Sequence, residues 1–321
     1  MRRISLWSAS GFRFIFCMFS RPFSHPSDSS STKVEMDDPD RLFGRLPEGC
    51  ISHILSYTTP RDACRSSTLS HTFKSASESD TVWEKFLPSD CSEILSKSVN
   101  PVEFSSKKEL YFRLCDPILI DGGKMSFSIE KTTGKKCFML SARELSIVWG
   151  DTPSYWKWTN HPQSRFAEVA VLNSVCWLEI HGLINSRMLS PKTTYSAHFI
   201  MGYDVGSHGL EFPLAEVSVR LGSQVSEHTA SLQSEENRSN RDRLWNMLNR
   251  PNMWRRTGAG NARCTARVPL PRSNGWSEIE LGDCYNDEGD EGKVNMSLLE
   301  VKGGNWKAGV IIEGIEIRPK V

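Results

Sequence analysis

The stretch LPEGCISHILSYTTPRDACRSSTLSHTFKSASESDTVWEKFL, residues 46–87, decides how the front of this chain folds. It opens on Leu46-Pro47, and proline is favoured at the first turn of a helix because its missing N–H would have no partner there. Ile51, Ile54 and Leu55 follow at the i, i+3, i+4 spacing of one helix face. The stretch is therefore expected to begin with an amphipathic helix.

Two further short helices are expected in the same stretch. Thr59-Pro60 separates the first helix from the second, because the residue before proline is pushed out of the helical region. Asp62 then lies in a first helical turn, where a carboxylate complements the helix dipole. The last piece ends at Pro88 and carries four apolar residues, Val82, Trp83, Phe86 and Leu87. Three such helices bury too little to be stable alone, so they need the rest of the chain or a partner to complete their core.

The Leu-Pro-Glu start, the spaced isoleucines, the Pro60-Arg61-Asp62 step and the late Val82-Trp83 pair together resemble an F-box. The resemblance implies that residues 41–88 dock onto a SKP-type adaptor and, through it, onto a cullin scaffold. It also implies an adaptor-binding face made of Leu46, Pro47, Ile51, Ile54, Leu55 and Trp83. The alternative is a small helical subdomain whose apolar face serves only the core of its own chain.

Composition places the chain among folded intracellular proteins. Its 321 residues suffice for one large or two ordinary domains. The formal net charge is +1, so no global field indicates nucleic acid as a partner. The nine cysteines are scattered without a C-x-x-C pair, which is typical of reduced thiols.

Residues 1–40 differ from the rest and are expected to form a disordered or targeting-like extension. Four arginines precede the first carboxylate, Asp28, as in an organellar transit peptide. The apolar run 15–19 is far shorter than the ~20 residues of a membrane span, so none is expected. An equally good interpretation is a non-native extension before a start at Met36. We therefore expect a nuclear and cytoplasmic protein, or an organellar one if residues 1–35 are a genuine transit peptide.

After the first unit, the periodicity changes from helical to extended. Residues 89–97 and 105–115 are expected to be helical, within a helical linker over residues 89–117. Met125, Phe127 and Ile129 then alternate with polar residues, as in a half-buried strand. Further strands are expected at residues 166–172, 176–180, 195–201, 216–221, 277–281, 294–299 and 310–317. The fold class is therefore α+β multidomain: a helical unit, then an all-β antiparallel sandwich that is jelly-roll-like, over residues 118–321.

One segment of this β region, residues 222–265, is polar. We expect it to be a long solvated insertion between two strands. The alternative is a partner-binding helix with Leu244, Met247 and Leu248 on one face.

Residues 118–321 resemble the phloem protein 2, or Nictaba-like, domain. Its motifs stand here as ARELSIVWG at 142–150, YWKW at 155–158, VCWLEIHG at 175–182, GWSEIELG at 275–282 and EVKGGNWKAG at 300–309. The resemblance implies a carbohydrate-binding sandwich whose lectin members recognise N-acetylglucosamine oligomers and N-glycan cores.

Tryptophans are the candidate sugar-binding residues, because the apolar face of a pyranose stacks on a flat ring. Trp149 and Trp156 occupy the places that matter in lectin members, and their neighbour Trp158 could share the role. The competing interpretation is that they are core anchors. Trp177 and Trp306 are expected in the core, and His161 and His181 are expected to be structural.

No catalytic motif of weight occurs in the chain: there is no G-x-S-x-G, no H-E-x-x-H and no P-loop. We therefore expect a non-catalytic protein without a cofactor, the substrate receptor of an SCF-type ubiquitin ligase. The β-domain would hold a protein or glycoprotein target, in the second case by an N-acetylglucosamine-containing glycan. The alternative function is an intracellular lectin that acts without a ligase.

Overall fold

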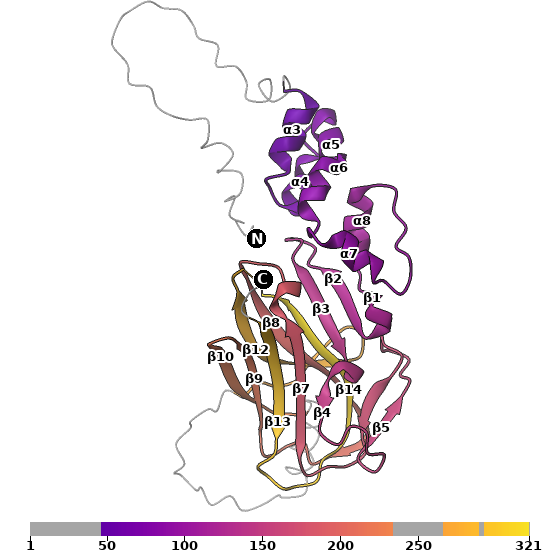
Figure 1. Cartoon of the computed structure of the whole chain (residues 1–321), viewed down its shortest axis with the longest axis vertical. Coiled ribbons are helices and arrows are strands. Elements are labelled where there is room, and N and C mark those ends of the chain that lie inside the picture. Colours follow the sequence, from indigo (N-terminus) through magenta and orange to yellow (C-terminus); the bar gives the residue numbers. More distant parts are fainter. Residues whose placement is uncertain (1–45, 234–265, 289–291, 321) are drawn as a thin grey trace, which may run out of the picture. The chain divides into compact units, whose positions relative to one another are not determined.

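The computed structural model describes residues 46–233, 266–288 and 292–320, and it places helices before strands along the chain (Figure 1). The helices are α3 Glu48–Leu55, α4 Pro60–Ser66, α5 His71–Glu78, α6 Asp80–Phe86, α7 Cys91–Ser96 and α8 Lys107–Leu114. The expected extension 1–40 lies outside the described residues. The predicted order, helices first and then antiparallel strands, is confirmed.

Side-chain caps define where α4, α5 and α8 begin. The hydroxyl of Thr59 accepts a hydrogen bond from the backbone N–H of Asp62 (3.1 Å), and Pro60 occupies the first turn of α4. Ser70 caps α5 and Ser106 caps α8 in the same way. Each cap satisfies a backbone N–H that the helix itself leaves without a partner. Thr59 itself is extended (φ −103°, ψ 156°), as the sequence predicts for the residue before a proline.

The rest of the chain completes the core of the helical unit. Trp83 on α6 is fully buried, and its ring lies 5.1 Å from that of Tyr111 on α8. The Tyr111 hydroxyl in turn donates a hydrogen bond to the carbonyl of Lys131 (3.2 Å), in the turn between the first long strands. Gly134 in that turn packs so closely that a Cβ would lie 2.6 Å from the carbonyl of Phe86. The small core of the helices is thus closed by α8 and by the β-domain.

The β-domain consists of two antiparallel sheets. The larger sheet has the order β1-β2-β3-β14-β8-β12-β11, with β6 also pairing with β14 and β5 pairing with β6. Its strands are β1 Ile118–Ile120, β2 Met125–Ile129, β3 Lys136–Ser141, β5 Trp156–Thr159, β6 Val169–Leu172, β8 Thr193–His208, β11 Leu270–Pro271, β12 Ser277–Asn286 and β14 Ala308–Pro319. The smaller sheet has the order β10-β9-β13-β7-β4. Its strands are β4 Ser146–Ile147, β7 Leu178–Asn185, β9 Ala215–Leu221, β10 Gln224–Ala230 and β13 Lys293–Glu300.

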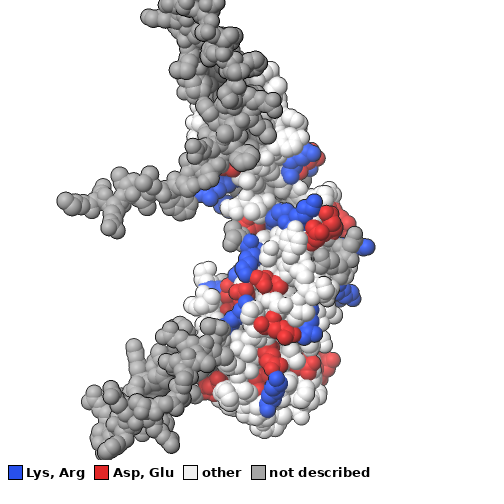
Figure 2. Space-filling model, turned by 90° about the vertical axis from the view of Figure 1, so that its left-hand side faces the viewer, with Lys and Arg blue, Asp and Glu red and all other residues white. Residues whose placement is uncertain are grey.

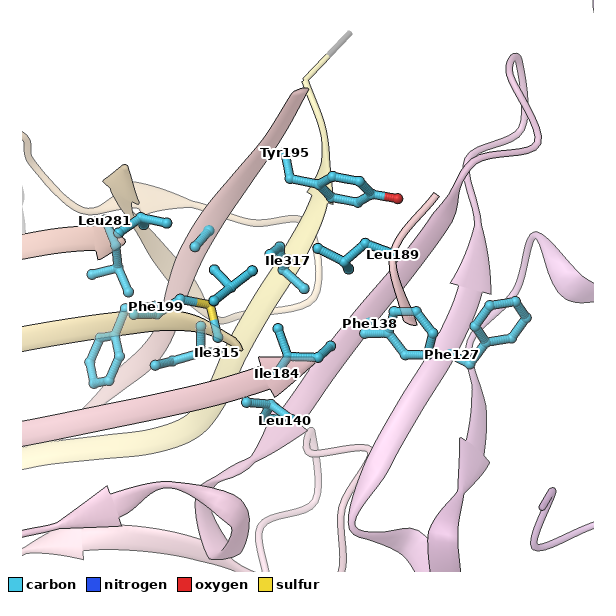
Figure 3. Packing of buried hydrophobic residues seen from close by; sticks show 14 of the residues in the cluster. Phe127, Phe138, Leu140, Ile184, Leu189, Tyr195, Phe199, Leu281, Ile315 and Ile317 are labelled. Atoms are coloured by element: carbon cyan, nitrogen blue, oxygen red, sulfur yellow. The ribbon is translucent and has the colours of Figure 1, made fainter. Parts of the chain in front are cut away.

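Apolar side chains from both sheets meet in one core (Figure 3). Gly182 on β7 shows how close the layers are, since a Cβ there would lie 3.0 Å from Cδ1 of Ile315 on β14. Along β7 burial alternates strictly, with Leu178, Ile180 and Ile184 inside. Period-2 alternation covers one face of a sheet and leaves the other in solvent. The predicted sandwich is confirmed, and its smaller sheet has an open outer face.

The polar segment 222–265 is not wholly an insertion. Residues 224–230 form β10, which pairs with β9 through a turn at Gly222, where φ is +55°. Their polar composition suits an edge strand that is largely exposed. Ser231, Leu232 and Gln233 are then buried. The remainder of the expected insertion, including Leu244, Met247 and Leu248, lies outside the described residues.

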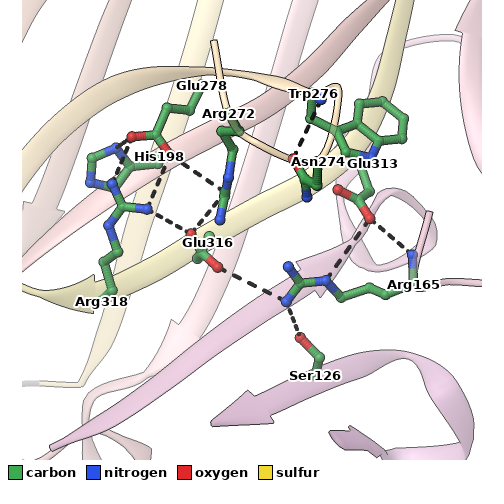
Figure 4. Close-up of polar contacts among 10 residues, drawn as sticks. All are labelled: Ser126, Arg165, His198, Arg272, Asn274, Trp276, Glu278, Glu313, Glu316 and Arg318. Atoms are coloured by element: carbon green, nitrogen blue, oxygen red, sulfur yellow. Dashed lines mark hydrogen bonds and ion pairs between the residues drawn. The ribbon is translucent and has the colours of Figure 1, made fainter. Parts of the chain in front are cut away.

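The outer face of the larger sheet carries a network of charged side chains (Figure 4). The carboxylate of Glu278 accepts a hydrogen bond from Arg318 (2.7 Å), and Arg318 also contacts Glu316 (2.9 Å). His198 is buried among these groups, 3.7 Å from Glu278. Burial and the neighbouring Arg318 lower the pKa of His198 to about 4, against the opposing pull of Glu278, Glu316 and Glu280.

We expect the substitution His198→Gln to reduce the loss of stability on acidification. In the unfolded chain His198 gains its proton at its ordinary pKa of 6.5, whereas in the fold it does so only near 4. Between these values the unfolded state binds more protons, so the wild type loses up to roughly 3 kcal/mol from this group as the pH falls. Urea unfolding of both proteins across this window measures the difference. Parallel stability curves would contradict the assignment.

Candidate functional site

The six residues of the expected adaptor-binding face divide into two groups. Ile51, Leu55 and Trp83 are buried within this chain, with 1%, 2% and 0% of their surface exposed. Ile54 is 39% exposed, Pro47 is exposed and Leu46 is half-buried. The interior group consists of core residues, which corrects the expectation that all six side chains face a partner. Direct contact of Leu46, Pro47 and Ile54 with an adaptor stays a prediction.

Helix geometry explains this division. Residues four apart lie almost one above the other, so Ile51 and Leu55 point into the same core. Ile54 stands at the border of that face and remains accessible. Tyr57, which follows α3, is 77% exposed, and its ring packs edge-on against His53 with centroids 5.2 Å apart. An exposed aromatic directly after an amphipathic helix is a signal that the sequence reasoning missed.

The three candidate sugar-binding tryptophans also differ in exposure. Trp149 is 44% exposed, Trp156 is buried and Trp158 is half-buried. The indole N–H of Trp156 donates to the carbonyl of Val148 (3.2 Å), and that of Trp158 donates to the carbonyl of Gly150 (2.9 Å). Both indoles therefore brace the turn at Trp149, where φ is +57°.

The roles of these tryptophans can now be separated. Burial removes Trp156 from direct sugar stacking, which corrects that part of the expectation. The guanidinium of Arg143 lies 3.7 Å from the ring centroid of Trp158 and so occupies one of its faces. Trp149, which packs against Tyr155 with centroids 5.4 Å apart, is the member of the group that the turn presents to solvent.

Trp177 and Trp306 are not core residues, contrary to expectation. Trp177 is 43% exposed and Trp306 is 55% exposed. Trp177 precedes β7 in phase with Glu179 and His181, so all three lie on the outer face of the smaller sheet. The alternation was a signal in the sequence that Trp177 lies on the outer face, because the buried residues of β7 occupy the positions between Trp177, Glu179 and His181. His181 likewise lies half-buried on the open face.

A single carboxylate links Trp177 to His181. Oε2 of Glu179 accepts a hydrogen bond from the indole N–H of Trp177 (2.7 Å), and its Oε1 lies 2.9 Å from Nε2 of His181. These two hydrogen bonds, of which the one with His181 has the larger effect, hold the pKa of Glu179 below its ordinary value. At neutral pH the carboxylate is therefore ionised and fixes the orientation of the exposed indole.

A hollow of about 700 Å³ lies on the same outer face. Strand register places Ser146, His181, Ser297, Ser218 and Glu227 in one row across β4, β7, β13, β9 and β10. The hydroxyls of Ser218 and Ser297 share a hydrogen bond of 2.8 Å. The charged groups are paired: Arg220 with Glu227 (2.7 Å), and Glu216 with Lys302. The hollow thus offers hydroxyl, amide and imidazole groups among neutralised charges.

Basic and acidic side chains are interspersed on the face shown in Figure 2. Within the described ranges, no group of three or more His, Cys, Asp or Glu side chains is placed to hold a metal ion. Among the helices described, none has both the length and the apolar character that crossing a bilayer requires. The exposed side chains and hydrogen bonds described above leave two candidate sites. One is the exposed apolar surface on α3, and the other is the polar outer face of the smaller sheet beside the exposed tryptophans.

Comparison with known families matches residues 43–85 to the F-box domain and residues 135–319 to phloem protein 2. Among known proteins, the F-box protein PP2-B10 of Arabidopsis thaliana is 44% identical over 280 residues, which cover 86% of this chain and 94% of that protein. The F-box protein VBF of the same plant is 43% identical over 278 residues, covering 86% and 99%. Among solved structures, the insecticidal crystal protein CRY2AA overlaps 62% of this chain and 25% of its own at 8% identity, with a TM-score of 0.29 that supports no argument.

Proposed function

The chain belongs to the F-box proteins that carry a phloem protein 2 domain, and from this premise we propose that it is the substrate-recognition subunit of an SCF-type ubiquitin ligase. The F-box supports an SKP-type adaptor as partner, and the adaptor would connect the chain to a cullin. The β-domain would hold the target, a protein or a glycoprotein. The subunit itself is non-catalytic in this proposal, because the ubiquitin chemistry belongs to the other members of the complex.

One observation carries the adaptor side of the proposal. The helical unit closes its own core through Ile51, Leu55 and Trp83, yet it leaves Ile54 and Pro47 in solvent at one edge of α3. Exposed apolar side chains fixed on a rigid element suit a binding surface, since little side-chain freedom is lost on binding. Tyr57 adds an aromatic anchor of the kind enriched at interfaces.

The mechanism would be proximity. A target held by the β-domain is tethered near the charged conjugating enzyme, which raises the effective concentration of its lysines without new bond chemistry in this chain. The seven cysteines of the described residues are free thiols, which supports the nucleus and cytoplasm as its location. The alternative of organelle targeting depends on residues 1–35.

The substitution Ile54→Asp in the full chain is expected to weaken binding to a purified SKP-type adaptor at least about thirtyfold, because a charge would replace an apolar contact in the interface. Titration calorimetry measures the affinity, and melting curves check that the fold is unchanged. Val99→Asp is the matched control, since Val99 is also exposed and apolar but lies in the linker after α7. A wild-type chain that does not bind the adaptor, or equal effects of both substitutions, would contradict the proposal.

A second candidate function is an intracellular carbohydrate-binding lectin that acts without a ligase. The exposed Trp149, whose turn is braced by the indole hydrogen bonds of Trp156 and Trp158, favours it. The two candidates are separated by the adaptor titration: sugar binding without adaptor binding supports the lectin.

A further inference from the structure

We propose that the loops before β9 and before β14 form a docking surface for a protein target, whose bound segment carries a large apolar side chain flanked by lysine or arginine. The residues of this surface, which we call the loop surface, are Phe212, Pro213, Lys302, Gly303 and Asn305. The inference rests on the proposed function, because it names the kind of target segment that the β-domain would hold.

Apolar side chains are exposed at and beside the loop surface. Phe212 is 77% exposed, and Trp306, which directly follows Asn305, is 55% exposed. Val205, in a bulge of β8 where its pairing with β14 is interrupted, is fully exposed. Single exposed apolar residues are normal on a protein surface, whereas several of them on neighbouring loops are typical of an interaction site.

The loop surface lines a hollow of about 500 Å³. Its two polar side chains are already engaged within the protein. The ammonium of Lys302 forms an ion pair with Glu216, and the side-chain amide of Asn305 donates to the carbonyls of Gly209 (3.2 Å) and Phe212 (3.1 Å). The lining that remains for a ligand consists of two rings, a glycine and the apolar stem of the lysine, which suits a large apolar side chain.

The two loops are locked against each other. A Cβ at Gly303 would lie 2.3 Å from Cδ of Pro213, and a Cβ at Gly209 would lie 2.0 Å from the carbonyl oxygen of Trp306. Only glycine allows contacts this close. Together with the hydrogen bonds of Asn305, these contacts hold the hollow in shape before a ligand arrives, so binding costs little ordering of the loops.

Negative charge predominates in the segments that carry the loop surface. Residues 203–216 and 300–308 contain four carboxylates but only two lysines. Each lysine forms an ion pair with a carboxylate of the same segments. Asp204, which is exposed, and Glu211, directly before Phe212, are the other two acids. Such a surface attracts a basic segment and is repelled by an anionic lipid leaflet, which favours a protein partner over a membrane.

The test is selection from a random peptide library displayed on phage, with the full chain as bait and the Phe212→Ala chain used to remove peptides that bind elsewhere. We expect the selected peptides to combine a large apolar residue with lysine or arginine. In titration calorimetry with one such synthetic peptide, Phe212→Ala should weaken binding about tenfold or more, and Phe212→Leu should weaken it less. Val225→Ala is the matched control, because Val225 is 55% exposed but lies opposite Arg220, at the other end of β9.

Charge reversal tests the electrostatic part of the inference. Asp204→Lys, at an exposed position, should weaken binding of the basic peptide about threefold or more at low salt. A peptide whose basic residues are replaced by glutamate should bind this variant better than it binds the wild type. The inference is overturned if no peptide is selected, if the selected peptides lack basic residues, if the charge swap restores nothing, or if Phe212→Ala and Val225→Ala have equal effects.

Two further measurements distinguish the remaining outcomes. In sedimentation with vesicles of phosphatidylcholine and phosphatidylserine in equal parts, the chain should stay in solution; vesicle binding that Phe212→Ala abolishes would assign the loop surface to a membrane instead. Adaptor binding is measured on the same variants and should not change. If the adaptor binds while no peptide does, only this inference falls; if a peptide binds while the adaptor does not, only the ligase proposal falls.

Discussion

Replacing Trp83 with alanine is expected to lower the free energy of unfolding by about 4 kcal/mol, as large-to-small changes at buried aromatic residues do. Trp83 is fully buried on α6, where its ring lies 5.6 Å from Phe86 and 5.3 Å from Phe112. Its indole N–H donates to the carbonyl of Ser77 (2.7 Å). The substitution leaves both a cavity and a buried carbonyl without its donor.

Urea unfolding followed by far-ultraviolet circular dichroism measures this effect. Trp83→Phe keeps much of the ring packing but loses the hydrogen bond to Ser77, so its cost should be smaller. Trp306→Ala, at a 55% exposed tryptophan, should change stability by no more than about 0.5 kcal/mol. If Trp83→Ala left stability unchanged while it abolished adaptor binding, Trp83 would be an interface residue and its place in the core would be wrong.

The second large effect is expected at Lys307. Its ammonium forms an ion pair with Glu300, and both side chains are almost completely buried. The same ammonium donates to the carbonyls of Cys176 (3.0 Å) and Asn305 (2.9 Å), so it joins the segment before β7 to the loop before β14. Lys307→Met would leave the Glu300 carboxylate buried without its counter-charge, at a cost of about 3–5 kcal/mol.

A double substitution distinguishes the interaction between the two charges from the interactions of each side chain with its surroundings. Lys307→Met with Glu300→Gln removes both charges, and it should recover a large part of the stability that the single substitution loses. Urea unfolding of the wild type, both single variants and the double variant completes the cycle. A single variant within about 1 kcal/mol of the wild type would show that the pair is solvated, contrary to the structure.

The sequence predicts the architecture well because local physics specifies it. Period-2 alternation located β2, and the Thr59-Pro60 step located the start of α4. The sequence did not predict the edge strand β10, because its residues are polar and an edge strand with an open outer face needs few apolar residues. Its strand character comes from pairing with β9, which no local pattern encodes.

The candidate sites were harder to predict, because periodicity shows which residues share a face but not which layer covers that face. Trp177 shares its face with Glu179 and His181, a clue to exposure that was outweighed by the general tendency of tryptophan to be buried. Trp156 shows the opposite case: a candidate binding residue is buried, and its indole donates a hydrogen bond to the turn at Trp149. In α3, the spacing of Ile51 and Leu55 indicated an apolar face, but α5 and α6 decide that the face is closed within the chain.

Hydrogen exchange of the full chain with and without a purified SKP-type adaptor tests the central claim most directly. The account predicts that the adaptor protects peptides covering residues 46–58, around the exposed Ile54 and Tyr57, and leaves β7, β9 and β13 unchanged, so that one surface holds the adaptor while the sheet stays free for a target. No protection over residues 46–58, or protection of those three strands instead, would contradict it.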